Sequence, residues 1–103
     1  MYKVITLLRA RQEMRDIANY IRTEFDSPVA AKRLMRRFKE ASARLKEHPF
    51  SCPVYLSEIP LEHEYRKLVV KNYIIFYWVD EEKKLVTVAR VIHANLNHGD
   101  VLT

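Results

Sequence analysis

Hydrophobic residues in the first half of the chain recur every three or four positions, which is the period of an α-helix with one buried face. A first stripe follows a short apolar strand predicted over residues 2–8 and consists of Ala10, Met14, Ile17, Ala18, Ile21 and Phe25. A second stripe consists of Ala31, Leu34, Phe38, Ala41 and Leu45. Ser27 and Pro28 are typical of an N-cap and a first helical position, and Pro49 ends the second helix. The pattern therefore predicts two amphipathic helices that form a hairpin over a sheet.

After the second helix the pattern changes from helical to extended. Residues 48–60 contain three prolines and are predicted to form a loop, with a short extended piece at 54–56. Three runs rich in β-branched and aromatic residues follow, at 64–70, 73–79 and 85–93. Short polar gaps of hairpin length separate them, so the three strands are expected to be antiparallel. The middle run is apolar without alternation, which is typical of a strand covered on both faces.

The order of these elements predicts an α+β domain in which a helical hairpin packs on one face of a mainly antiparallel, twisted sheet. The 103 residues are 49% hydrophobic and 30% charged, which favours a single globular domain over residues 1–103. The longest unbroken apolar run, 73–79, is far shorter than the roughly 20 residues of a membrane helix. The apolar start is too short for a secretory signal, so we expect a cytoplasmic protein without a membrane partner.

Two rare residue types exclude several classes of site. The single cysteine, Cys52, excludes an internal disulfide and a four-cysteine zinc site. The single glycine, Gly99, excludes the glycine-rich loops that bring backbone amides against phosphate. A ligand phosphate would therefore be bound by side chains, and the net charge of +5 supplies them.

Basic residues are concentrated on the second predicted helix. Four of them are predicted to form a patch that binds the backbone of a nucleic acid: Lys32, Arg33, Arg36 and Arg37. Each Lys or Arg that neutralises a phosphate releases counterions, which gives affinity without sequence readout. The alternative is a solvated helix face without a ligand.

Two arginines are expected to project from apolar strand faces. Arg66 has the same strand parity as the apolar residues at 68 and 70, and Arg90 has the same parity as those at 86, 88 and 92. Because a charge on such a face is costly unless it is paired, one expectation is pairing with Glu62, Glu64 or Asp80. The other is a site for a ligand phosphate, which a guanidinium binds with two parallel hydrogen bonds.

His93 stands at the end of the last predicted strand and is a candidate acid or base, because histidine titrates near neutral pH. A metal site formed with His98 and Asp100 is an alternative, but their spacing matches no established ligand pattern. We therefore expect no metal and no other cofactor.

Three short motifs resemble those of the RelE/ParE superfamily, the toxins of bacterial type II toxin–antitoxin modules. They are Tyr65-Arg66-x-Leu68, Asn72-Tyr73-Ile74-Ile75-Phe76-Tyr77 and Arg90-Val91-Ile92-His93. They follow the two helices in the order of that fold, and the resemblance covers nearly the whole chain. It implies a β-α-α-β-β-β fold, with or without one further strand. It also implies an acidic antitoxin partner whose extended segment wraps the toxin.

The resemblance implies one of two targets. RelE-like members cut mRNA on translating ribosomes, whereas ParE-like members inhibit DNA gyrase. The metal-independent nucleases of the superfamily have arginines that match Arg66 and Arg90, in some branches a histidine that matches His93, and an acidic base for which Glu64 is a candidate. The paired lysines of RelE and the terminal tyrosine of some nucleases are absent here.

We interpret the sequence as a ribosome-dependent mRNA endoribonuclease, or mRNA interferase, that inhibits translation. The reason is that the arginines, acids and histidines are expected to converge on one edge of the fold. Gyrase inhibition without nuclease activity is the alternative.

Overall fold

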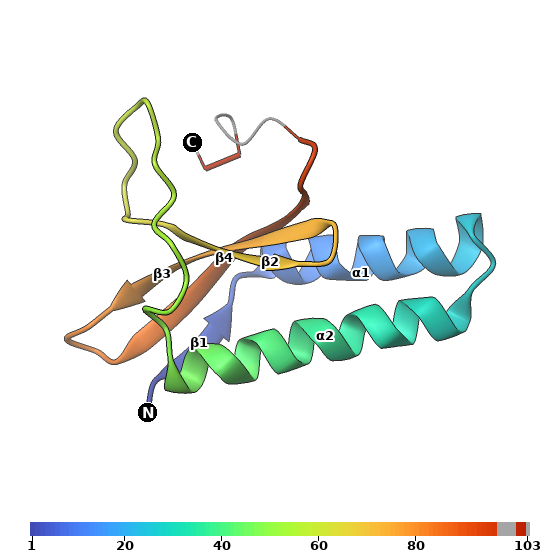
Figure 1. Cartoon of the computed structure of the whole chain (residues 1–103), viewed down its shortest axis with the longest axis horizontal. Helices are drawn as coiled ribbons and strands as arrows, with labels where there is room; N and C mark the ends of the chain where they lie inside the picture. Colours follow the sequence, from blue (N-terminus) through green and yellow to red (C-terminus); the bar gives the residue numbers. More distant parts are fainter. Residues whose placement is uncertain (97–100, 103) are drawn as a thin grey trace.

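A helical hairpin covers one face of a four-stranded sheet in the computed structural model, which describes residues 1–96 and 101–102 (Figure 1). The elements in chain order are β1 (Lys3–Thr6), α1 (Leu8–Glu24), α2 (Pro28–Glu47), β2 (Arg66–Val70), β3 (Tyr73–Asp80) and β4 (Leu85–His93). The strand order is β1-β4-β3-β2, with β1 parallel to β4 and the other neighbours antiparallel. The predicted α+β fold is therefore confirmed. Within the described residues, no helix combines the length and the hydropathy needed to span a membrane.

The start of the chain differs from the prediction by a few residues. The strand predicted over 2–8 is shorter, and α1 begins at Leu8. The reason is Leu7, whose backbone N–H donates to the carbonyl of Val88 at 2.9 Å, while its own carbonyl accepts the N–H of Arg11 at 3.1 Å. Leu7 thus makes the last backbone bond to β4 and accepts the first hydrogen bond of α1.

The corner between the helices matches the prediction. The Ser27 hydroxyl oxygen accepts the backbone N–H of Ala30 at 3.2 Å, and Pro28 takes the first helical position. Asp26 has a positive φ of 46° immediately before the cap, which turns the chain between the helices. All five residues of the second predicted stripe are buried.

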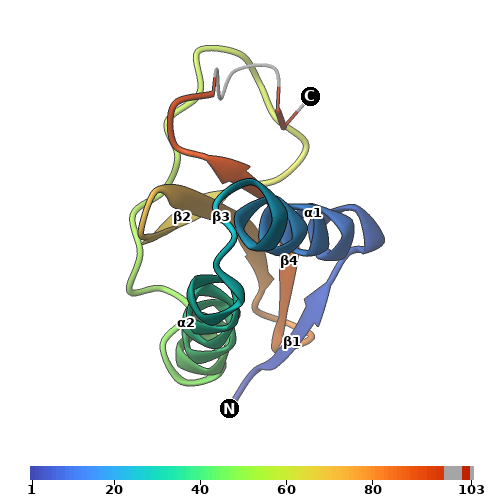
Figure 2. The ribbon, with the colours of Figure 1, turned by 90° about the vertical axis from the view of Figure 1, so that its right-hand side faces the viewer.

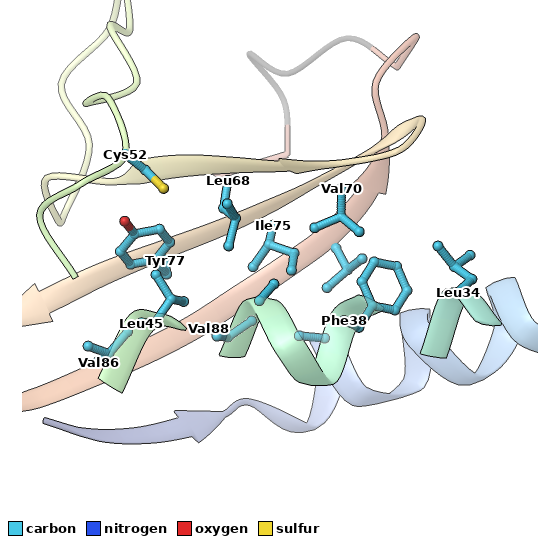
Figure 3. Packing of buried hydrophobic residues seen from close by; sticks show 13 residues of the cluster. Leu34, Phe38, Leu45, Cys52, Leu68, Val70, Ile75, Tyr77, Val86 and Val88 are labelled. Carbon is cyan, nitrogen blue, oxygen red and sulfur yellow. The ribbon is translucent and has the colours of Figure 1, made fainter. Parts of the chain in front are cut away.

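The core consists of two clusters, one on each face of the sheet. The helix-side cluster includes Leu34, Phe38 and Leu45 of α2, Ile75 and Tyr77 of β3, and Val86 and Val88 of β4 (Figure 3). The far-side cluster consists of Tyr65, Ile74, Phe76, Ala89 and Ile92. β3 contributes to both clusters, as predicted for a strand covered on both faces.

The loop after α2 runs around the β2 edge to the far side of the sheet, where the C-terminal residues also lie (Figure 2). It covers the far-side cluster with Tyr55 and Leu61, and residues 101–102 pack on the same cluster. Near its start the loop borders β2, because Val54 forms a bridge to Arg66. The extended piece predicted at 54–56 is reduced to this bridge, and β2 begins two residues later than predicted.

Candidate functional site

The guanidinium of Arg66 binds the loop that follows α2. Its Nη1 donates to the carbonyl of Cys52 at 2.7 Å and to that of Phe50 at 3.4 Å. The guanidinium carbon lies 5.0 Å from the centre of the Phe50 ring, and Nη2 lies 3.7 Å from Glu64 Oε1. The predicted pairing with Glu64 is confirmed. Only 17% of the Arg66 side chain is exposed, against 71% for Glu64.

Tyr77, the cross-strand neighbour of Arg66, binds the same loop. Its hydroxyl donates to the carbonyl of Pro49 at 2.7 Å. Burial raises the pKa of Tyr77, so the phenol remains neutral and continues to donate. Together the two side chains attach residues 49–52 to the sheet.

Arg90 forms a bidentate ion pair with Glu13 of α1. Its Nε lies 3.0 Å from each carboxylate oxygen, and its Nη2 lies 2.7 Å from Oε2. Its Nη1 donates to the carbonyl of Val101 at 2.7 Å, which connects the C-terminal residues to the sheet. The expectation that Glu62, Glu64 or Asp80 pairs with Arg90 is therefore wrong.

A β-bulge explains why Arg90 does not share the predicted face with Val86 and Val88, although it does share the face of Ile92. Tyr77 pairs with Val88 but Phe76 pairs with Arg90, so Ala89 is an extra residue in β4. Val86 and Val88 belong to the helix-side cluster, whereas Phe76 and Ala89 belong to the far-side cluster. Beyond the bulge, Arg90 therefore no longer shares the face of the residues at 86 and 88.

Glu13 also covers an open edge of the sheet. Backbone pairing along the outer edge of β4 ends where Leu7 bonds to Val88. Farther along this edge, the backbone N–H of Val91 donates to Glu13 Oε1 at 2.9 Å. An unpaired N–H at a strand edge is thus satisfied by a helix carboxylate.

His93 lies at the other end of the sheet from Arg66. Its ring packs edge-to-face against Tyr73 with centres 5.4 Å apart, and its Nδ1 accepts the backbone N–H of Asn95 at 3.1 Å. It borders a surface hollow of about 650 Å³ with Asp16 and Tyr20 of α1. His98 and Asp100 lie outside the described residues, and within the described part of the chain no three metal-ligating side chains come together.

The four predicted catalytic residues are therefore divided. Arg66 is opposite Tyr77 on β3 and His93 is opposite Tyr73, which separates them by about 13 Å along the strand direction. Arg66 pairs with Tyr77, which belongs to the helix-side cluster, whereas Arg90 pairs with Phe76, which belongs to the far-side cluster. The two arginines therefore project from opposite faces of the sheet. The structure brings Arg66 and Glu64 together and keeps both away from His93. Arg90 and His93 do line one hollow, together with Glu13, whereas Arg66 and Glu64 lie elsewhere. The expected convergence of all four residues on one edge is therefore not observed.

The predicted nucleic-acid patch is exposed along α2. Lys32, Arg33, Arg36 and Arg37 are all solvent-exposed. Arg33 and Arg37 border hollows next to the β2–β3 turn, where Lys71 forms the opposite wall. In residues 1–96 and 101–102, none of these cations forms an ion pair.

Comparison with known proteins identifies the family. The model of the ParE toxin of the type II toxin–antitoxin system parDE matches residues 4–97. The chain belongs to the ParE toxin family. No curated protein sequence is similar enough to this ParE-family toxin to match it.

Solved structures share the fold of this ParE-family toxin. The chromosomal ParDE system of P. aeruginosa aligns with a TM-score of 0.71 and 16% identity, over 92% of this chain and 98% of the other. The isolated RelE toxin of E. coli aligns with a TM-score of 0.63 and 21% identity, over 95% and 89%. The archaeal RelE–RelB complex of Pyrococcus horikoshii aligns with a TM-score of 0.64 and 16% identity, over 93% and 98%. The resemblance to the RelE/ParE superfamily is thereby confirmed.

Two residues of this ParE-family toxin were missed as site residues by sequence reasoning. Glu13 is 77 residues away from Arg90 in the chain, and no sequence pattern indicates that they pair. Arg44 follows Arg37 by seven residues, which is two helical turns, so the helical period was a usable signal that it lines the same flank.

Proposed function

We propose that this ParE-family toxin inhibits DNA gyrase by binding to it, without cleaving mRNA. Metal-independent RNA cleavage needs a base, an acid and a cation within hydrogen-bond reach of one phosphate. Arg66 and Arg90 instead project from opposite sheet faces, and each guanidinium is already bonded within the protein. This division of the two arginines carries the proposal, since an inhibitor that acts by binding does not require them to meet.

We also propose an acidic antitoxin as the partner that neutralises the toxin. The archaeal RelE with the same fold was solved in complex with RelB. The net charge of +5 favours fast association with an acidic segment, because opposite charges steer the encounter. Growth arrest on induction, relieved by co-expression of an acidic neighbouring gene product, is the expected result. Harmless expression of folded protein would contradict the toxin activity.

Two assays, run side by side, test the target. Purified toxin added to gyrase and relaxed plasmid should block supercoiling in a concentration-dependent way. Primer extension on a reporter mRNA after toxin induction should show intact message. Cut message together with normal supercoiling would refute the proposal.

A ribosome-dependent mRNA endonuclease is the second candidate function. The observation in its favour is the contact between Arg66 and the exposed carboxylate of Glu64, which places a cation beside a group that water and substrate can reach. In this function Arg66 and Arg90 bind the phosphate, and His93 and Glu64 transfer protons. His93→Ala should then reduce cleavage on programmed ribosomes by about a hundredfold or more. Ribosome binding should survive, because the basic helix is unchanged.

A further inference from the structure

The outward side of α2 and the neighbouring β2–β3 turn form one strongly basic surface. We call it the cationic face, and it consists of Lys32, Arg33, Arg36, Arg37, Lys39, Glu40, Arg44 and Lys71. All eight side chains are exposed. Among the described residues, none of the seven basic side chains has an ion-pair partner.

The cationic face holds the whole net positive charge of the protein. Its seven basic residues and one acidic residue give a charge of +6. The other 11 basic and 12 acidic residues of the chain give −1. An excess of positive charge confined to one surface is the electrostatic footprint of a polyanion site.

The cations form two rows. Arg33, Arg37 and Arg44 lie on the flank of α2 that faces β2, and Lys71 stands across from them in the hollows between the two elements. Lys32, Arg36 and Lys39 are spaced four and three residues apart, so they form the second row on the outer ridge of α2. From Arg33 to Arg44 the helix rises by about 16 Å, which corresponds to roughly five successive phosphates of one DNA strand.

The composition of this surface favours a phosphate backbone over a protein partner. Between residues 32 and 44 of α2, the exposed positions carry cations, Glu40 and Ala43. Protein interfaces are centred on large apolar or aromatic anchors, and this part of the helix exposes none. The exposed apolar residues nearby, Phe25 and Val69, border the two hollows from the end of α1 and from β2. Arginine binds phosphate with two parallel hydrogen bonds, and the flank facing β2 carries three arginines.

We propose that the cationic face binds the sugar–phosphate backbone of duplex DNA, so that the toxin contacts gyrase and the DNA held by gyrase together. The second part of this statement rests on the proposed function. The flank row, Arg33, Arg37 and Arg44 with Lys71, neutralises the phosphates. Binding therefore does not depend on base sequence and is sensitive to salt.

Fluorescence anisotropy of a short labelled duplex, titrated with the toxin at several salt concentrations, tests the DNA site. Four neutralised phosphates give a slope of log K against log salt of about −3.6, so affinity falls about 150-fold between 50 and 200 mM salt. The double variant Arg33→Gln/Arg37→Gln should reduce this slope by about 1.8 and weaken binding at low salt by at least about tenfold.

The matched control is Arg9→Gln/Arg15→Gln, which removes the same charge from exposed positions of α1. It should keep the wild-type slope and an affinity within about twofold. An equal loss in both double variants would show a non-specific charge effect and would overturn the proposal. Displacement of the DNA by poly-glutamate as readily as by unlabelled duplex would overturn it in favour of an acidic protein.

The supercoiling assay separates this inference from the proposed function. If Arg33→Gln/Arg37→Gln loses DNA binding and inhibits gyrase less, both the DNA-binding role of the cationic face and the proposed gyrase inhibition stand. If it loses DNA binding and still inhibits gyrase fully, the role of the cationic face in the gyrase complex is refuted and gyrase inhibition stands. If the wild-type toxin binds DNA with the expected slope but leaves supercoiling unchanged, the proposed function fails and the DNA site stands.

Discussion

Replacement of Glu13 by alanine should destabilise the fold by removing the carboxylate that pairs with Arg90. The Arg90 side chain is 14% exposed and that of Glu13 is 21% exposed, so the pair is mostly withdrawn from water. Breaking a buried ion pair by removing one partner costs about 3–5 kcal/mol. Because water still reaches both groups, we expect the lower end, a loss of about 3 kcal/mol in the free energy of unfolding. The backbone N–H of Val91 loses its acceptor in the same variant.

Urea unfolding followed by circular dichroism measures this loss, with Asp16→Ala as the matched control. Asp16 lies three residues further along α1 and is exposed. Its replacement should change the unfolding free energy by no more than about 0.5 kcal/mol. Glu13→Gln keeps an oxygen that can accept the backbone N–H of Val91. Its loss of unfolding free energy should therefore lie between those of Glu13→Ala and Asp16→Ala.

A double-mutant cycle with Arg90→Ala shows whether the two side chains act together. If the pair is coupled, Arg90→Ala should cost much less in the Glu13→Ala background than in the wild type, because the bridge is already broken. Strict additivity, or a Glu13→Ala variant as stable as Asp16→Ala, would refute the reasoning. Arg90 would then be free to bind an external phosphate, which would revive the nuclease function.

Three further predictions follow from the loop and helix contacts. Arg66→Ala should lower the unfolding free energy by about 2 kcal/mol in urea melts, because the carbonyl of Cys52 loses a charged donor; unchanged stability would mark Arg66 as a ligand-binding group. Ser27→Ala should cost about 1 kcal/mol in the same assay, since α2 loses its N-cap. Tyr77 has a raised pKa when folded, so its stabilising contribution is complete below its ordinary pKa near 10 and is lost as pH rises above it. Tyr77→Phe should therefore be less sensitive to alkaline pH, and equal sensitivity would contradict this.

The sequence was sufficient for the elements whose formation depends on local pattern. The stripe from Ala31 to Leu45 has the helical period and became the buried face of α2. Ser27 and Pro28 mark the start of this helix by their chemistry, and the structure places them there. These features depend on residues a few positions apart, so they can be predicted from the order of residues in the chain.

The predictions that were wrong concern features that depend on long-range pairing. The bulge at Ala89 adds one residue to β4 without a glycine or proline to signal it, and it changes the face of Arg90. Glu13 meets Arg90 only because β1 is short and α1 follows the open edge of β4 beyond it. Neither the bulge nor the edge is visible before the strands are placed next to one another.

The nucleic-acid patch shows the same limit. Helical spacing was enough to place Arg33 and Arg37 near each other on one exposed helix. It did not show that this flank faces β2, where Lys71 joins it from a turn far along the chain. Tertiary packing therefore divided the predicted patch into a flank row and an outer ridge.

The environment of each cation indicates which of them can bind an external anion at low cost. To bind a phosphate, Arg66 would have to give up its bonds to two carbonyls, and Arg90 its bonds to Glu13 and Val101. Loss of the part-buried bonds, those to Cys52, Val101 and Glu13, leaves polar groups in poorly hydrated positions, which costs about 1–3 kcal/mol for each group. Arg33 and Arg37 are exposed and give up only water and counterions, whose release favours binding. Binding an anionic ligand therefore costs less free energy at α2 than at the two strand arginines. Arg66 and Arg90 instead hold the loop and the C-terminal residues against the sheet.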